Sequence, residues 1–164
     1  MNIIDAIKLL EERVPNPSEG LPDEIFYYAS RLTPLVNVDL LVKDKNNRVL
    51  LSWRHDRYAG EGWHLPGGIV RFRETLEERV RKVAEKEIGV AVDFDPVPVE
   101  VNQIIIKEIK DRSHFISILY NCRLSADFVP ENKRLAETDA GYLKWHDGCP
   151  DDLLKLHNIY RKFL

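Results

Sequence analysis

One helix in this chain is specified at both ends by its own sequence. Thr75 followed by Glu78 has the spacing of a capping box, and Gly89 stands where the glycine that ends a helix belongs. These signals predict a helix over residues 75–88 with a register that can be assigned residue by residue. At about 100° per residue, its apolar stripe consists of Leu76, Val80, Val83 and Ala84.

Glu87 is a charged residue within that apolar stripe. It projects in the direction shared by Leu76, Val80 and Val83, and it lies in the last turn, where the helix dipole disfavours negative charge. Burying an ionised carboxylate without a partner costs several kcal/mol, so a cation or a raised pKa should accompany it. Three interpretations remain open: a bound divalent cation, a pairing with an arginine, or a frayed helix end that turns Glu87 to water.

Two glycines precede this helix. Gly67 and Gly68 form a turn in which backbone groups can approach a ligand closely, because no β-carbon intervenes. A carbonyl of this turn together with Glu87 would offer oxygen ligands to Mg²⁺, which takes its remaining ligands from water and phosphate oxygens. The arrangement favours chemistry on a phosphate-bearing substrate.

The rest of the chain mixes helices and strands without regular alternation. Residues 1–32 are expected to form an N-terminal helical arm, whose apolar faces must be covered by the main domain or by a second subunit. Residues 33–164 are expected to form one domain of α+β or layered α/β type with a mixed sheet. The period-two patterns around residues 36–43 and 49–54 indicate a hairpin, with Asp39 and Arg54 on the less uniformly apolar face of each strand.

Composition excludes several classes of protein. The 164 residues are 44% hydrophobic and 31% charged, as in an ordinary globular domain, and the formal charge of −3 comes without a basic block for nucleic acid or an anionic membrane. No apolar run approaches the ~20 residues of a membrane span, and the first residues do not resemble a signal peptide. We expect a cytoplasmic protein with a small-molecule substrate and neither nucleic acid nor membrane as a partner. Cys122 and Cys149 match no metal motif or disulfide framework.

At the predicted helix the sequence resembles a Nudix box. The segment is GGIVRFRETLEERVRKVAEKEIGV, and the box pattern is G-x5-E-x7-R-E-U-x-E-E-x-G-U, with U an aliphatic residue. The positions that match are Gly68, Glu74, Glu87, Gly89 and Val90. The positions that differ are Lys82, Val83, Ala84 and Lys86, which stand where the box has arginine, glutamate, an aliphatic residue and glutamate. The fold that the resemblance implies is a mixed β-sheet between helices, in α/β/α layers.

One branch of the family, the GDP-mannose mannosyl hydrolases, also keeps only the final glutamate of the box cluster. Residues 33–90 resemble that branch, and its N-terminal arm contributes to dimer formation, which implies a homodimer here. The resemblance implies Mg²⁺, or alternatively Mn²⁺, as cofactor, with Gly67, Glu87 and Glu137 as its ligands. It also implies catalytic roles for Asp39 and Arg54.

Two residues of that branch have no direct counterpart here. Its arginine after the double glycine is replaced by Ile69, and Arg57 or Arg71 would substitute in binding substrate. Its catalytic histidine is absent, and we expect Asp139 to act as the base while Glu137 binds the metal. His64 and His157 are interpreted as surface or strand histidines rather than ligands.

The activity that this resemblance implies is hydrolysis of a nucleoside diphosphate sugar by attack of water at the anomeric carbon. Two alternatives stay open. One is a diphosphatase that cleaves P–O–P in a nucleoside diphosphate derivative, and the other is a nucleotide-binding module without turnover, suggested by Lys82, Val83 and Lys86.

Overall fold

The computed structural model describes residues 2–125 and 127–164. In chain order, its elements are α1 (Ile3–Arg13), η1 (Pro17–Glu19), α2 (Asp23–Ser30), β1 (Leu35–Lys43), β2 (Val49–Asp56), β3 (Gly60–His64), β4 (Gly67–Ile69), α3 (Leu76–Val83), η2 (Ala84–Ile88), β5 (Asp93–Phe94), β6 (Glu100–Ile105), β7 (His114–Arg123), β8 (Leu143–His146) and η3 (Lys155–Phe163). None of the helices within these ranges combines the length and the hydrophobicity needed to cross a bilayer.

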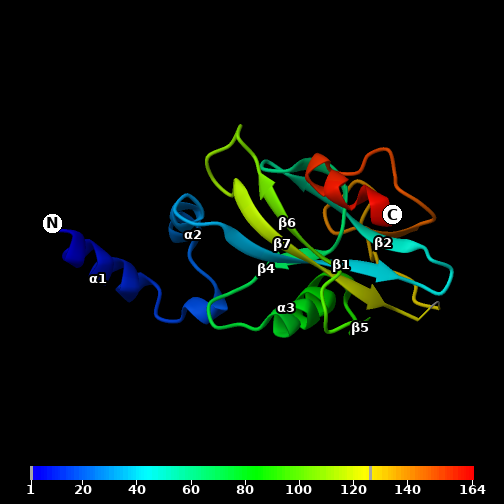
Figure 1. Ribbon diagram of the computed structural model, residues 1–164, viewed down its shortest axis with the longest axis horizontal. Helices are drawn as coiled ribbons and strands as arrows, with labels where there is room; N and C mark the ends of the chain where they lie inside the picture. The colour runs from blue at the N-terminus through cyan, green and yellow to red at the C-terminus, as the bar shows by residue number, and fades with distance from the viewer. Residues whose placement is uncertain (1, 126) are drawn as a thin grey trace.

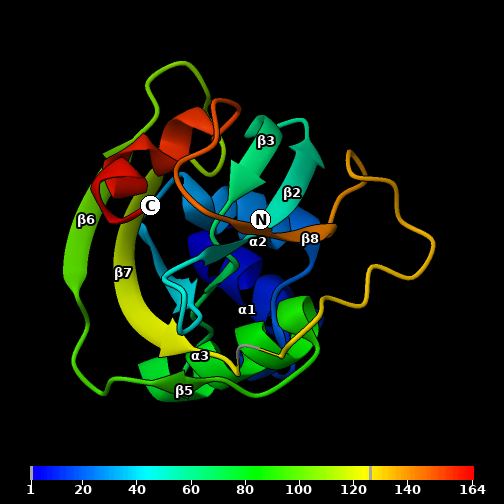
Figure 2. The same ribbon diagram turned by 90° about the vertical axis from the view of Figure 1, so that its right-hand side faces the viewer.

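The strands form one mixed sheet. β1 runs parallel to β7 along its whole length and antiparallel to β4, while β2 pairs antiparallel with β3 and β8. β7 also pairs antiparallel with β5 and β6, and the long strands β6 and β7 curve strongly (Figure 2). The α+β fold with a mixed sheet is therefore confirmed.

A hydrophobic core lies on each face of the sheet. On one face, α3 and η2 pack Val80 and Ile88 against residues such as Leu40. On the other face, the C-terminal η3 packs Tyr160 against Leu41. Figure 1 shows α3 and the C-terminal segment on opposite sides of the strands, which is the layered arrangement that the sequence predicts. The C-terminal segment forms a 3-10 helix over Lys155–Phe163.

The hairpin expected for β1 and β2 is confirmed only at its closed end. The two strands pair solely at Lys43 and Val49, among the residues described, and then separate. The edges of β1 are taken by β7 and β4, and those of β2 by β3 and β8. The separation leaves space for a cavity between Asp39 on β1 and Arg54 on β2.

The helix specified by its own caps forms as predicted. Thr75 Oγ1 accepts the Glu78 amide at 3.2 Å, and Glu78 Oε2 accepts the Thr75 amide at 2.8 Å. The last turn, η2, is a π-helix that the sequence pattern did not predict, and the Gly89 amide donates to the Ala84 carbonyl. Gly89 takes the left-handed conformation with φ 86°, which glycine adopts at little cost. Glu87 lies in this widened turn.

The N-terminal arm has two different parts. α1 projects away from the domain and has no buried residue, and Ile3 remains 75% exposed (Figure 1). α2 lies against the domain, where Ser30 is buried and Phe26 lines the cavity. The main domain therefore covers α2 and leaves the apolar side chains of α1 exposed.

Candidate active site

A cavity of about 1130 Å³ opens where β1 and β2 separate. Its walls come from both halves of the sheet, from η2 and from the N-terminal arm. The residues predicted for the site that line it are Asp39, Arg54, Gly67, Arg71 and Glu87. The structure thus brings together side chains that are up to 48 positions apart in sequence, from Asp39 to Glu87.

Glu87 is half-buried at the wall of this cavity. Its Oε2 accepts the Gly67 amide at 3.2 Å, and no lysine or arginine among the described residues forms an ion pair with it. Burial raises the pKa of Glu87 to about 7, against the opposing effects of that hydrogen bond and of Arg54. Of the three interpretations of Glu87, neither the frayed helix end nor the pairing with an arginine describes this geometry.

Asp39 is a second carboxylate close to Glu87. It is buried, and its oxygens accept hydrogen bonds from Asn37 at 2.9 Å, from Tyr160 at 2.6 Å and from Ser117. Burial raises the pKa of Asp39, although these hydrogen bonds oppose the rise. The two carboxylates therefore form an acidic end of the cavity.

The double glycine lets β4 pack closely between Asp39 on β1 and Val83 on α3. A β-carbon at Gly67 would collide with the Asp39 carboxylate and lie 2.9 Å from the Val38 carbonyl oxygen. A β-carbon at Gly68 would lie 2.8 Å from Cγ2 of Val83 on α3. The close packing of β1, β4 and α3 thus requires glycine at both positions.

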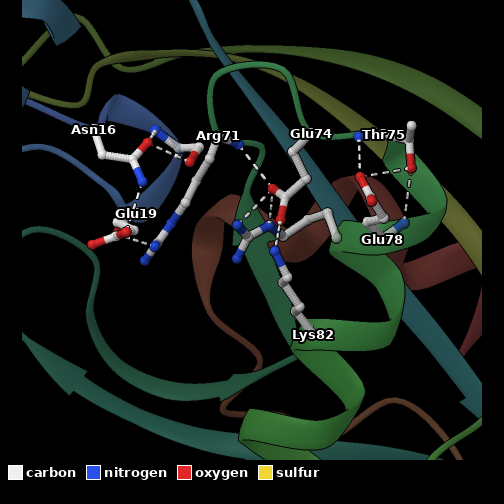
Figure 3. Close-up of polar contacts among 9 residues, drawn as sticks. Asn16, Glu19, Arg71, Glu74, Thr75, Glu78 and Lys82 are labelled. Atoms are coloured by element: carbon white, nitrogen blue, oxygen red, sulfur yellow. Dashed lines mark hydrogen bonds and ion pairs between the residues drawn. The ribbon is translucent and has the colours of Figure 1, made fainter.

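Glu74 anchors the start of the box helix. Its side chain is 4% exposed and accepts hydrogen bonds from Arg79 at 2.7 Å and Lys82 at 2.9 Å, as well as from the Arg71 amide (Figure 3). Burial raises the pKa of Glu74, but these partners outweigh it and lower the pKa to about 2. Lys82, which stands where the box has arginine, therefore forms an ion pair with Glu74.

The other replacements within the box have separate surroundings. Val83 is 3% exposed and belongs to the core beneath α3. Lys86 is exposed and lines the cavity beside Glu87. The carboxylates missing from the box are thus replaced by a core side chain and a cation.

The arginines predicted for the site have different settings. Arg54 forms an ion pair with Asp56 inside the cavity. Arg71 also lines it and donates to the Glu19 carbonyl of the arm, beside Asn16 (Figure 3). Arg57 is exposed and does not line the cavity. Its guanidinium lies over the Tyr58 ring, 4.7 Å from the centroid, and donates a hydrogen bond to the Tyr58 hydroxyl.

The structure does not bring Glu137 or Asp139 into the cavity. Glu137 is exposed and paired with Lys144, with Nζ 2.6 Å from Oε1. Asp139 is exposed and accepts the Ala136 amide at 2.7 Å in a local turn. Among the described residues, no cluster of three or more histidine, cysteine, aspartate or glutamate side chains could hold a metal by itself. This geometry therefore supports neither Glu137 as a metal ligand nor Asp139 as the base.

Two histidines line the cavity, although the sequence pattern indicated surface or strand positions for them. His64 Nδ1 lies 2.7 Å from the Ser52 carbonyl oxygen, and His157 Nδ1 accepts the Leu65 amide at 3.2 Å. Burial lowers the pKa of each ring to about 3, helped by His157 in the case of His64 and by Arg54 in the case of His157, so both rings are neutral. The position of His64 directly before LPGG was the available signal, since that segment enters the glycine turn.

The Nudix domain matches residues 33–164, which is most of the chain. The chain belongs to the Nudix family of hydrolases. A solved structure of a MutT Nudix hydrolase from Burkholderia pseudomallei has the same fold, with a TM-score of 0.64 and 22% identity over 80% of this chain and 98% of that chain. The resemblance found in the box is thereby confirmed at the level of the family.

Two curated relatives match parts of the Nudix chain. The low-salt glycan biosynthesis protein Agl8 of Haloferax volcanii is 35% identical over 79 residues, which are 48% of this chain and 50% of that protein. A CMP-5'-(N-acetyl-N-hydroxy-3-aminopropyl)phosphonate hydrolase of Streptomyces rubellomurinus is 38% identical over 52 residues, which are 30% of this chain and 25% of that protein. The matched regions span about half and a quarter of these relatives.

The Glu74 ion pairs predict how the free energy of unfolding depends on pH. A carboxylate with a lowered pKa in the folded state stabilises above its unfolded pKa, and this contribution is lost as pH falls through the folded value. Glu74→Gln should therefore lower the free energy of unfolding at pH 7 by about 2 kcal/mol, less than the full shift would give because Lys82 is exposed. The deficit should shrink between about pH 5 and pH 2 in urea denaturation series.

Glu85→Gln is the matched control, because Glu85 is an exposed carboxylate of the same helical segment. It should leave the free energy of unfolding within about 0.5 kcal/mol of the wild type. An equal deficit for Glu74→Gln at pH 7 and pH 2 would show that the ion pairs do not carry the effect.

Proposed function

We propose that this Nudix hydrolase cleaves a nucleoside diphosphate sugar with Mg²⁺, or alternatively Mn²⁺, as cofactor, by attack of water at the anomeric carbon. The observation that carries the proposal is Glu87, a half-buried carboxylate with no ion-pair partner among the described residues. It accepts the Gly67 amide in a cavity that Asp39 and Arg54 also line. The resemblance to GDP-mannose hydrolases and the name of the glycan biosynthesis relative support a sugar nucleotide.

The residues at the acidic end of the cavity fit a hard divalent cation. Glu87 has one oxygen, Oε1, without a partner among the described residues, and a cation there would relieve the cost of placing this carboxylate beside Asp39. Glu87 and the Gly67 carbonyl would hold Mg²⁺, which keeps several waters and takes phosphate oxygens, so few protein ligands suffice. When bound, the ion would neutralise charge on the diphosphate.

The remaining residues of the cavity have separate tasks. Arg54 supplies positive charge to the phosphate oxygen that leaves the anomeric carbon. Arg71 at the rim would contact the substrate, whereas the exposed Arg57 holds Tyr58, which lines the cavity. Both carboxylate oxygens of Asp39 already accept hydrogen bonds, so Asp39 does not accept the proton of the attacking water. Its negative charge acts on neighbouring groups instead.

We assign the role of general base to His64 instead of Asp139, the residue expected from the sequence. A carbonyl oxygen accepts but cannot donate, so the contact with Ser52 places the proton on Nδ1 and the lone pair on Nε2. As the water oxygen bonds to the anomeric carbon, Nε2 accepts its proton, the carbon–oxygen bond to the diphosphate breaks, and its electrons remain on the phosphate oxygen. The nearby Asp39 stabilises the imidazolium that forms.

An isotope experiment tests which bond breaks. Hydrolysis in H₂¹⁸O with Mg²⁺ should place the label in the sugar, because water attacks carbon, and mass spectrometry of both products measures this. Label in the nucleotide product would contradict the proposal and favour the diphosphatase, for which the name of the phosphonate hydrolase relative is the supporting observation. Saturable binding of a panel of nucleotide sugars without product would favour a binding module.

Substitution of His64 tests the assignment of the base. His64→Gln should lower kcat by about 10² to 10⁴, the usual contribution of a positioned base, with little change in KM. Asp139→Asn should leave kcat within about twofold, because Asp139 lies outside the cavity. His114→Gln is the matched control, since His114 pairs with Gln103 away from the cavity. Loss of kcat in Asp139→Asn alone would sink the assignment.

We further propose that the protein is a cytoplasmic homodimer, with α1 contributing to the subunit contact. The support is the apolar surface of this helix, on which Ile3, Ile4 and Ile7 are each about half exposed or more. Sedimentation equilibrium should give twice the monomer mass, and a monomer at micromolar concentration would contradict the proposal.

A further inference from the structure

Arg112 is a cation in the cavity that forms no ion pair with any carboxylate of the described residues. It lies in the loop between β6 and β7 and lines the cavity together with Arg54. Its Nε is buried and has no hydrogen-bond partner among the described residues. The neighbouring carboxylates are already paired, Asp111 with Arg31 at 3.4 Å and Asp56 with Arg54.

Contacts from other elements hold Arg112 in place without neutralising it. Its amide donates to Ser30 Oγ of α2 at 3.0 Å. Its guanidinium lies over the rings of Phe26 and Tyr58, 5.8 Å and 5.3 Å from their centroids. Aromatic faces attract a cation, and they leave its charge available to an anion.

Arg112 and Arg54 are two cationic residues that line the same cavity as the carboxylates Asp39 and Glu87. Burial and the proximity of Arg54 both lower the pKa of Arg112, while Arg54 also acts on Glu87. Arg54, Arg112 and Glu87 all line the same cavity. Two like charges in a partly buried site repel, and an anion bound between them would remove that cost.

We propose that Arg112, together with Arg54, binds the phosphate group of the substrate that lies farther from Glu87. This inference rests on the proposed function, because it requires a diphosphate in the cavity. A guanidinium matches a phosphate group with two parallel hydrogen bonds, and the free Nε of Arg112 supplies one donor of such a pair. One phosphate would then lie near Glu87 and the other between the two arginines.

A purely structural role for Arg112 makes a different prediction. In that case the side chain would only fasten the β6–β7 loop to α2 and Tyr58, and its removal would lower thermal stability. The affinity of the folded protein for phosphate groups would then stay unchanged. Anion affinity and stability must therefore be measured separately.

The test uses inorganic pyrophosphate as the ligand of the metal-free protein in EDTA, followed by isothermal titration calorimetry. Arg112→Gln should weaken binding at least tenfold, and Arg112→Lys should weaken it less, because charge without the planar fork retains part of the attraction. Arg81→Gln is the matched control, since Arg81 is exposed and lies 5.3 Å from the Phe94 ring centroid outside the cavity. Equal affinity in Arg112→Gln and the wild type would overturn the proposal.

A second measurement uses the wild-type protein and so does not depend on the folding of a variant. In the wild-type protein, NMR of the arginine Nε–H groups should show a shift of the Arg112 signal on addition of pyrophosphate and none for Arg81. An unshifted Arg112 signal at saturation would also overturn the proposal. Because neither experiment involves turnover, a protein that fails to hydrolyse sugar nucleotides can still confirm Arg112, and an active hydrolase can still refute it.

Discussion

The direction of Glu87 depends on how the helix that carries it is fixed at both ends. The Thr75–Glu78 capping box sets where the helix begins, and Glu74 ties its first turns to Arg79 and Lys82. Gly89 ends it in the left-handed conformation after a π turn. Because neither end is free to shift, the carboxylate stays half-buried at the cavity wall, where the Gly67 amide is its single donor among the described residues.

The cavity forms where β1 and β2 of the sheet separate beyond the pair Lys43 and Val49. In the part of the chain that the structure describes, β1 and β2 pair only beside the turn that joins them, and β4 pairs with β1 along the edge left open. The two glycines allow that strand to lie against Asp39 on one side and Val83 on the other. The result is a cavity lined by the carboxylates Asp39 and Glu87 and by the cations Arg54 and Arg112, which suits a diphosphate held with a cation.

Local patterns predicted the parts of the site that local contacts determine. The helix, its caps, the glycine turn and the unusual position of Glu87 all follow from residues within about 20 positions of one another. The strand faces of Asp39 and Arg54 followed from the period of two, and both residues line the cavity.

Long-range contacts account for what the sequence could not predict. His64 and Leu65 meet His157 through a contact between residues 92 positions apart, which no local pattern encodes. Glu137 and Asp139 were assigned from their place in the chain, but they form local pairs with Lys144 and Ala136 outside the cavity. Arg112 belongs to a turn-like segment whose proximity to Arg54 arises only in the folded chain.

The position of a bound metal ion tests the central claim most directly. Crystals of the protein grown with Mn²⁺ and a nucleoside diphosphate should give an anomalous peak within coordination distance of Glu87 and the Gly67 carbonyl. The account is contradicted if Glu87 points to solvent or pairs with a basic side chain while no ion lies near the double glycine.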